Sequence, residues 1–248
     1  MLLVPFLYVV YARTGLTLSA QTVVAHATSL GVAFVTSTVG SWRYARAHAI
    51  AWAPALCYAL PGILSAFATA RFLARVEGVQ WVRAAFGAFL LVAGWDMARR
   101  ARAQPAEGQQ GIPTTAWIWL AGIGVVGGGL SALLGIGGGL IAVPALMYVG
   151  RLPTRAVAPT ALAGVCITTL SGGLGYLTAS MAPPVSEWMA GFVDLRMALP
   201  LSLGAVCTVP IGVRVNRRSS PPTLYRLFAG IFVVIGLSIV WSWARATG

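Results

Sequence analysis

The amino-acid sequence predicts an all-α polytopic membrane protein, and composition and charge distribution are the two observations behind this prediction. Of the 248 residues, 58% are hydrophobic and 9% are charged, and the mean hydropathy is +0.82. A soluble domain carries about 25% charged residues. The charged residues also leave long charge-free stretches, most of them near or above the roughly 20 residues that cross a bilayer. These stretches are residues 14–42, 47–70, 108–150, 156–186, 197–213 and 227–244.

The charge-free stretches place the membrane elements in chain order. Residues 1–12 are apolar but too short to cross a bilayer, since a crossing needs roughly 20 residues. Full crossings are predicted at 20–41, 48–70, 79–98, 156–180, 196–213 and 224–244. Residues 99–114 contain three arginines, two prolines and a glutamate, and they form the one substantial polar linker.

The element at 115–150 is too long for one crossing. Its length as a continuous helix would be about 54 Å at 1.5 Å per residue, against a hydrocarbon core of about 30 Å. The run Gly135-Ile-Gly-Gly-Gly139 lies inside it, and glycine costs about 1 kcal/mol relative to alanine in a helix. We therefore expect a Gly-broken helix or a re-entrant hairpin that is interrupted at these glycines.

The two parts of the chain resemble each other, which predicts two related halves of about four membrane elements each. Val4-Pro5 corresponds to Val143-Pro144, and 27–30 corresponds to 159–162. Four further residues of the first part match four of the second part in order and at one constant offset along the chain. They are Arg71, Arg83, Gly87 and Phe89, which match Arg214, Arg226, Gly230 and Phe232. Residues 1–98 are then the first transmembrane repeat, 99–114 a cytoplasmic linker and 115–248 the second repeat. Internal repeats with an interrupted helix are typical of secondary transporters.

The start and the orientation of the halves give two further expectations. Met1 aligns with Leu140, so the first half lacks its N-terminal half-helix. Either this copy has lost that half-helix or the sequence starts late, and we expect in-frame upstream sequence to encode it. The 180–195 loop contains no arginine, which favours the outer side. With the arginine-rich linker inside, the 115–150 element enters and leaves on one face. This arrangement favours inverted repeats, although a parallel arrangement gives a nearly equal distribution of arginines and stays open.

Charge and motif content exclude several classes of function. The net charge of +12 comes from arginines at segment ends, where they contact anionic lipid headgroups. With no soluble basic face, nucleic acid is not an expected partner. The chain has five acids and two histidines, and it contains no hydrolase or metalloprotease motif. The sequence therefore predicts neither an enzyme nor a metal site, and no cofactor is expected.

The glycine run belongs to a pattern that resembles a known family. The pattern is Gly127-x3-Ser131-x3-Gly135-Ile-Gly-Gly-Gly-x4-Pro144-x-Leu146, followed by Ala158-Pro-Thr-Ala-Leu162 and Thr168-Thr-Leu-Ser-Gly172. It is similar to the sulfite exporter TauE/SafE family over essentially the whole chain. The resemblance implies a prokaryotic inner-membrane transporter of sulfite, sulfonates or related small organosulfur anions. The first half departs from it, because its own glycine motif is absent.

A small anion in a membrane needs hydrogen-bond donors, and the candidate residues follow from that need. Backbone N–H groups freed at the break can hold an anion, and hydroxyl groups can donate to a sulfonate oxygen. Threonine and serine hydroxyls more often bond to carbonyls of their own helix, and Gly127 and Ser131 also fit a packing face of small residues. His26 is a candidate for carrying a coupling proton, with a packing histidine as the alternative. The candidate substrate-binding residues are Gly135, Gly137, Gly138, Gly139, Pro144, Thr160, Thr168, Thr169, Thr28 and Ser29.

The sequence thus predicts a secondary transporter, in the export direction, for a small organosulfur anion. The alternative is a non-transporting integral membrane accessory or assembly subunit. Membrane lipids and the anion are the expected partners, and the oligomeric state, a homo-oligomer included, is left open.

Overall fold

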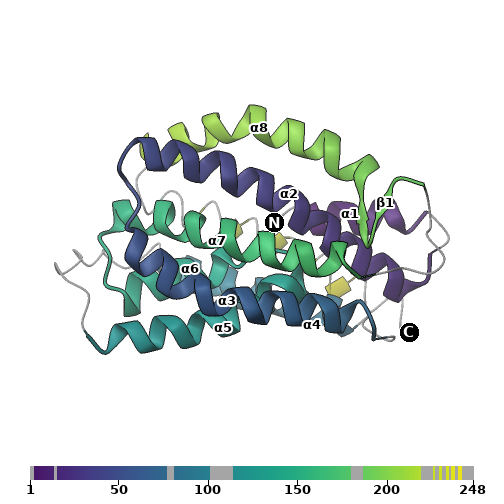
Figure 1. The fold of residues 1–248 in the computed structure, drawn as a ribbon, viewed down its shortest axis with the longest axis horizontal. Coiled ribbons are helices and arrows are strands. Elements are labelled where there is room, and N and C mark those ends of the chain that lie inside the picture. The colour runs from purple at the N-terminus through teal and green to yellow at the C-terminus, as the bar shows by residue number, and fades with distance from the viewer. Residues whose placement is uncertain are drawn as a thin grey trace.

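The computed structural model describes residues 3–13, 16–76, 81–100, 114–179 and 187–218, with single positions between 226 and 241. These residues form a helical protein with one short antiparallel hairpin (Figure 1). The helices are α1 (Leu3–Tyr11), α2 (Leu18–Arg46), α3 (Trp52–Leu73), α4 (Trp81–Arg100), α5 (Ala116–Leu134), α6 (Gly139–Pro144), the π-helical turn η1 (Ala145–Val149), α7 (Thr154–Leu177) and α8 (Leu195–Arg218). The hairpin strands are β1 (Met189–Ala190) and β2 (Val193–Asp194).

Five helices of the described ranges are long and apolar enough to cross a bilayer, namely α2, α3, α5, α7 and α8. They lie roughly side by side along the long axis of the molecule (Figure 1). Helix α3 packs against α5 and α7, and α2 packs against α7 and α8. The chain therefore folds as the multi-pass helical bundle that the sequence predicts.

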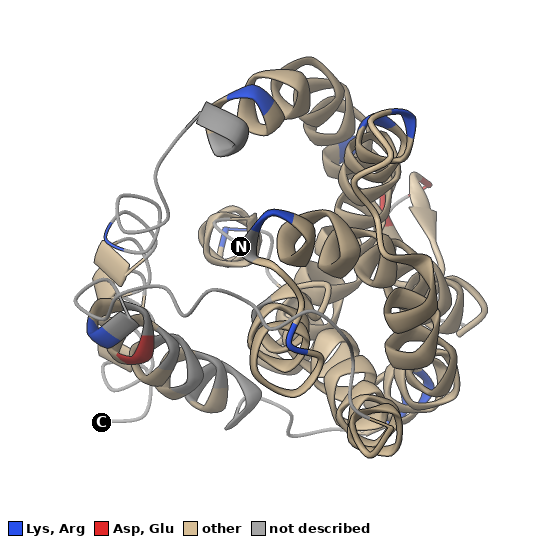
Figure 2. Ribbon diagram, turned by 90° about the vertical axis from the view of Figure 1, so that its left-hand side faces the viewer, with Lys and Arg blue, Asp and Glu red and all other residues tan. Residues whose placement is uncertain are grey.

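Helix α2 shows how the sequence fixes its ends. The side chain of Thr17 accepts a hydrogen bond from the Ala20 N–H group at 3.3 Å, which caps the first turn. Arg43 and Arg46 lie in the last turn, where positive charge is favourable next to unpaired carbonyls. The Arg46 guanidinium also lies 4.0 Å above the Trp42 ring. Figure 2 shows the same tendency in other helices, with basic residues near their ends.

Glycines allow α3 and α5 to approach each other closely. A Cβ atom at Gly124 would overlap the carbonyl oxygen of Tyr58, and one at Gly128 would overlap the carbonyl oxygen of Gly62. Small residues at helix contacts let backbones pack in van der Waals contact. Gly127 lies on the same face, against the Tyr58 ring, so the predicted packing role of Gly127 is confirmed.

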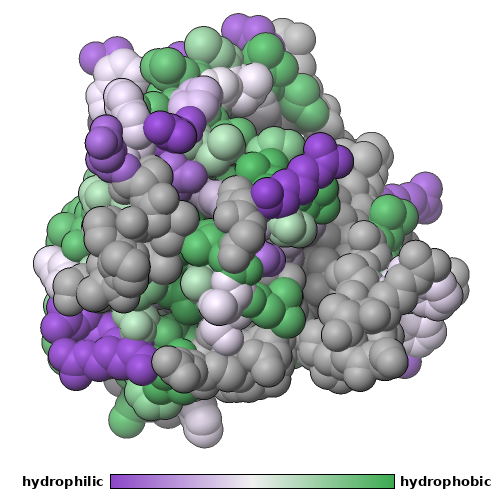
Figure 3. All heavy atoms as spheres, turned by 90° about the vertical axis from the view of Figure 1, so that its right-hand side faces the viewer, coloured by the Kyte–Doolittle hydropathy of each residue, from purple (hydrophilic) through white to green (hydrophobic). Residues whose placement is uncertain are grey.

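Buried hydrophobic residues of the described ranges gather in two clusters. One gathers α1, α2 and the hairpin around Leu30 and Tyr176, and the other joins α3, α5 and η1 around Tyr58 and Leu146. Large apolar side chains also cover the outside, such as Leu203 of α8, which is 69% exposed. Hydrophilic and hydrophobic side chains mix at the end that Figure 3 shows. An apolar exterior is what a helical bundle presents to lipid.

Several expectations fall outside the described residues. The crossing at 224–244 and most of the 99–114 linker belong to this group. The division into two repeats and their inverted arrangement stay predictions. The 180–195 segment, expected to be a plain loop, contains the β1–β2 hairpin, of which Phe192, Val193 and Asp194 are buried. The three cysteines are free thiols.

Candidate functional site

The predicted backbone break is present in the glycine run. Helix α5 ends at Leu134, and α6 begins at Gly139. Gly135, Gly137 and Gly138 have φ angles of 64°, 82° and 73°, in the left-handed region that glycine adopts without steric cost. The run therefore leaves the helix at residues that have no Cβ atom, and its peptide groups turn away from the α5 axis.

The break lies near the middle of the neighbouring helices. A Cβ atom at Gly137 would come within 2.9 Å of the Thr169 methyl group and 3.6 Å of the Ala33 methyl group. Thr169 is in the central part of α7, and Ala33 is in the central part of α2. The Tyr58 hydroxyl donates to the Gly138 carbonyl oxygen at 3.5 Å. The central parts of α2 and α7 and the first third of α3 thus surround the break.

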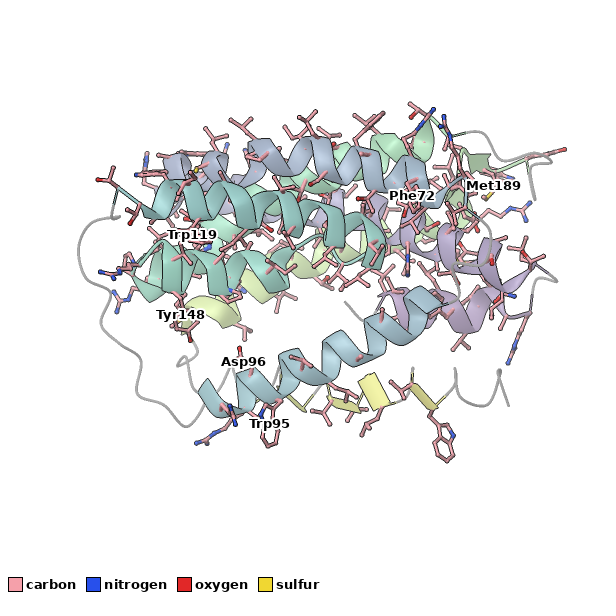
Figure 4. The ribbon with its side chains drawn as sticks, turned by 90° about the horizontal axis from the view of Figure 1, so that it is seen from below. Phe72, Trp95, Asp96, Trp119, Tyr148 and Met189 are labelled. Atoms are coloured by element: carbon pink, nitrogen blue, oxygen red, sulfur yellow. The ribbon has the colours of Figure 1, made fainter. Side chains whose placement is uncertain are left out.

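The 115–150 segment enters and returns at one end of the bundle. The Cys57 thiol near the start of α3 donates to the Trp117 carbonyl at the start of α5. Figure 4 shows Trp119 of α5 and Tyr148 of η1 at the same end of the molecule, opposite Phe72 and Met189. The segment is therefore a hairpin whose tip is the glycine break. Pro144 ends α6, and the π-helical turn η1 follows it directly; such turns are frequent at functional sites.

One turn of α2 holds the first residue of the break. The Ser29 hydroxyl donates to the Gly135 carbonyl oxygen at 2.8 Å. His26 lies against the same glycine, because a Cβ atom at Gly135 would come within 2.8 Å of the His26 Cα atom. The His26 side chain is 1% exposed, and its Nε2 atom is 2.5 Å from the Tyr8 hydroxyl. Two of the predicted residues on α2 are therefore brought to the break.

Thr28 lies on another face of α2 and contacts the β1–β2 hairpin. Its hydroxyl oxygen accepts from the Asp194 N–H group at 3.0 Å. The Asp194 carboxylate accepts from the Tyr11 hydroxyl at 3.0 Å and from the Arg196 N–H group at 2.9 Å. The structure therefore places the Thr28 hydroxyl at the β1–β2 hairpin and not at the glycine break.

The three candidate threonines of α7 have hydroxyl partners in the protein. The Thr160 hydroxyl accepts from the Ala51 N–H group at 3.0 Å, in the turn that leads into α3. Thr168 and Thr169 donate to carbonyls of their own helix, Thr169 to Val165 at 2.7 Å. The methyl group of Thr169, not its hydroxyl, faces Gly137. A substrate-binding role for these threonines stays a prediction, and for Thr168 and Thr169 it requires the hydroxyl to give up the carbonyl to which it now donates.

The structure adds two residues, Ser131 and Tyr58, that sequence reasoning did not assign to the site at the break. Ser131 is 1% exposed, and its hydroxyl oxygen has no hydrogen-bond partner. A Cβ atom at Gly138 would come within 3.3 Å of the Ser131 Cβ atom and 3.4 Å of the Tyr58 hydroxyl. The spacing of Ser131, one turn before Gly135, was the available signal, but it fits a packing role equally well.

The break is a neutral environment in the part of the chain that the structure describes. The arginines of the helices described here lie near helix ends or in connecting turns. Within these same ranges, no group of histidine, cysteine and acidic residues is arranged to hold a metal ion. Donors at the break are therefore peptide N–H groups and hydroxyls, which suit a small anion held without a fixed positive charge.

Comparison with known proteins finds similarity to membrane transporters. The family described as "Sulfite exporter TauE/SafE" matches residues 1–239. A probable membrane transporter protein of Methanocaldococcus jannaschii is 23% identical over 85% of this chain and 76% of its own length. A probable membrane transporter protein of Xylella fastidiosa is 27% identical over 87% of this chain and 81% of its own. The Bacillus subtilis protein YunE, also named a probable membrane transporter, is 25% identical over 63% of this chain and 58% of its own length. No solved structure matches.

Proposed function

This chain belongs to the sulfite exporter TauE/SafE family, and on that premise we propose that it is a secondary transporter that exports sulfite, a sulfonate or a related small organosulfur anion. The membrane is the prokaryotic inner membrane. The names of the relatives support membrane transport in general. The family description and the chemistry of the break support the anion.

The observation that carries the proposal is the glycine break beside an unpartnered buried hydroxyl. Three glycines with φ angles in the left-handed region turn the peptide groups away from the axis of α5 where that helix ends. The Ser131 hydroxyl next to Gly138 has no partner in the protein. A buried polar group without a partner costs about 1–3 kcal/mol, so its retention favours a ligand that bonds to it.

The proposed mode of binding uses neutral donors. Peptide N–H groups of Gly137, Gly138 and Gly139 and the Ser131 hydroxyl hold the anion oxygens. Each hydrogen bond to a charged group contributes about 1.5–3 kcal/mol, and desolvation of the anion offsets much of this. Binding is therefore weak and reversible, as a carrier requires. Broken helices at the midplane hold substrates in other secondary transporters.

The decisive experiment is an exchange assay with the purified full chain in proteoliposomes. Vesicles loaded with unlabelled sulfite are diluted into a trace of sulfur-35 sulfite, with methanesulfonate loaded in a parallel set. We expect label to accumulate transiently in loaded vesicles that contain the protein, and not in protein-free vesicles.

The same assay separates the proposal from its alternative. Absence of exchange with sulfite and with methanesulfonate, in preparations of folded and correctly incorporated protein, would contradict transport of this class of anion. That result would favour the accessory-subunit interpretation.

A further inference from the structure

His26 and Tyr8 form a buried pair of titratable groups that the anion site itself does not require. The His26 Nε2 atom and the Tyr8 hydroxyl oxygen share a hydrogen at 2.5 Å, and the two side chains are 1% and 8% exposed. Their rings pack at a centroid distance of 5.8 Å with a tilt of 48°. Ionisable residues inside a membrane protein are expensive and commonly mark ion or proton pathways.

The pair is in direct contact with the glycine break. The Cδ2 atom of the His26 ring is 3.2 Å from the position of a Cβ atom on Gly135. Ser29, one turn further along α2, donates to the Gly135 carbonyl oxygen. A charge on the imidazole would therefore arise immediately next to the proposed anion site, in surroundings with few other charges to screen it.

The neighbouring elements bring these titratable or charged groups to the region. Helix α1 contributes Tyr8 and Tyr11, α7 contributes Tyr176, and the hairpin contributes Asp194. Tyr176 donates to the Ala132 carbonyl oxygen, and Asp194 accepts from Tyr11 and from the Arg196 N–H group. The charged side chain of Arg196 is exposed at the start of α8.

We propose that His26 is a proton-binding site that couples proton binding to anion binding at the glycine break. This proposal rests on the transport function proposed above. A proton from the aqueous phase adds to the neutral imidazole and gives an imidazolium, and the Tyr8 hydroxyl then accepts the hydrogen that Nε2 donates. A buried imidazolium is costly alone and is stabilised by an adjacent anion.

The consequence is that proton and anion bind together. Thermodynamic linkage makes the effect reciprocal, so a bound proton raises the affinity for the anion by the same factor as a bound anion raises the affinity for the proton. Tyr8 is a positioning residue in this scheme, since it orients the imidazole without contacting the anion.

The test measures the half-saturation concentration for sulfite in exchange, with equal pH on both sides, over a range around the ordinary pKa of histidine. With one proton taken up per anion, lowering the pH by one unit lowers the half-saturation concentration by up to about tenfold. His26→Gln retains a polar side chain and is expected to flatten this dependence while exchange remains measurable. Sulfite itself also gains a proton in this pH range. The informative quantity is therefore the difference between wild type and variant in how the half-saturation concentration changes with pH.

Two further variants complete the design. His48→Asn changes the other histidine, an exposed residue with a φ angle of 51° that asparagine tolerates, and it should retain the wild-type dependence. Tyr8→Phe removes only the hydroxyl and should shift the midpoint of the pH dependence, and it decides the question if His26→Gln does not fold. Equal pH dependence in wild type, His26→Gln and Tyr8→Phe would overturn the proton site. Absence of exchange in the wild type would instead overturn the transport function.

Discussion

The Ser29 hydroxyl of α2 donates a 2.8 Å hydrogen bond to the carbonyl oxygen of Gly135, the residue that follows the end of α5. This contact joins the first half of the chain to the tip of the hairpin in the second half. The next residue on the N-terminal side, Thr28, bonds to the β1–β2 hairpin through the Asp194 N–H group. One turn of α2 therefore contacts both the glycine break and the β1–β2 hairpin, and a shift of this turn would move them together.

Replacement of Ser29 by alanine tests this contact. The Gly135 carbonyl oxygen would lose its partner inside the protein, and we expect the free energy of unfolding to fall by about 1–3 kcal/mol. Thermal unfolding in detergent measures the change. Thr208→Ala is the matched control, because the Thr208 hydroxyl bonds only within exposed α8. A loss in Ser29→Ala no greater than in the control would show that the contact does not hold the break.

Replacement of Gly138 by valine tests the break as an anion site. The φ angle of 73° strains a β-branched residue, and the new side chain would meet the Gly127 carbonyl and Ser131. We expect sulfite exchange to be abolished while the protein is still inserted in the membrane. Gly122→Val is the control, since nothing lies within 4 Å of a Cβ atom there. Normal exchange in Gly138→Val at normal membrane levels would leave the run as a packing feature only.

Replacement of Ser131 by alanine should change stability and binding in opposite directions. Removal of an unpartnered buried hydroxyl relieves an unfavourable desolvation, so the unfolding temperature without substrate should rise. The half-saturation concentration for sulfite should rise about tenfold, because a hydrogen bond to the anion is lost.

The second unpartnered buried hydroxyl among the described residues provides the control for this variant. Ser41 lies in the last third of α2, away from the break. Ser41→Ala should raise stability without changing the half-saturation concentration. A similar effect of both substitutions on sulfite exchange would argue against a specific role of Ser131.

Replacement of Gly128 by alanine tests the close packing of α3 against α5. The added methyl group would overlap the Gly62 carbonyl and come within 2.6 Å of the Ser65 hydroxyl. Overpacking of this kind costs about 1–3 kcal/mol, and we expect a lower unfolding temperature and a lower yield of folded protein. In Gly122→Ala the same change meets no atom and should stabilise α5 by up to about 1 kcal/mol. Equal stability of the two variants would contradict the contact.

Hydropathy and glycine content determined the coarse architecture. Long charge-free stretches predict membrane helices because an apolar helix satisfies its own backbone groups in lipid. The excess length of 115–150 and the run from Gly135 to Gly139 predict a broken element, and the structure confirms the break. These inferences depend on local composition and on bilayer thickness, and both can be read along the chain.

Which polar groups meet at the break was decided by the tertiary structure alone. Ser29 and Thr28 are neighbours in the sequence, yet one bonds to Gly135 and the other to Asp194, because successive helix positions face different partners. The hydroxyl of Ser131 is buried and unpartnered, and Gly138 of the returning segment lies beside it. The sequence shows which donors exist, whereas contacts between residues far apart in the chain decide which of them are already occupied.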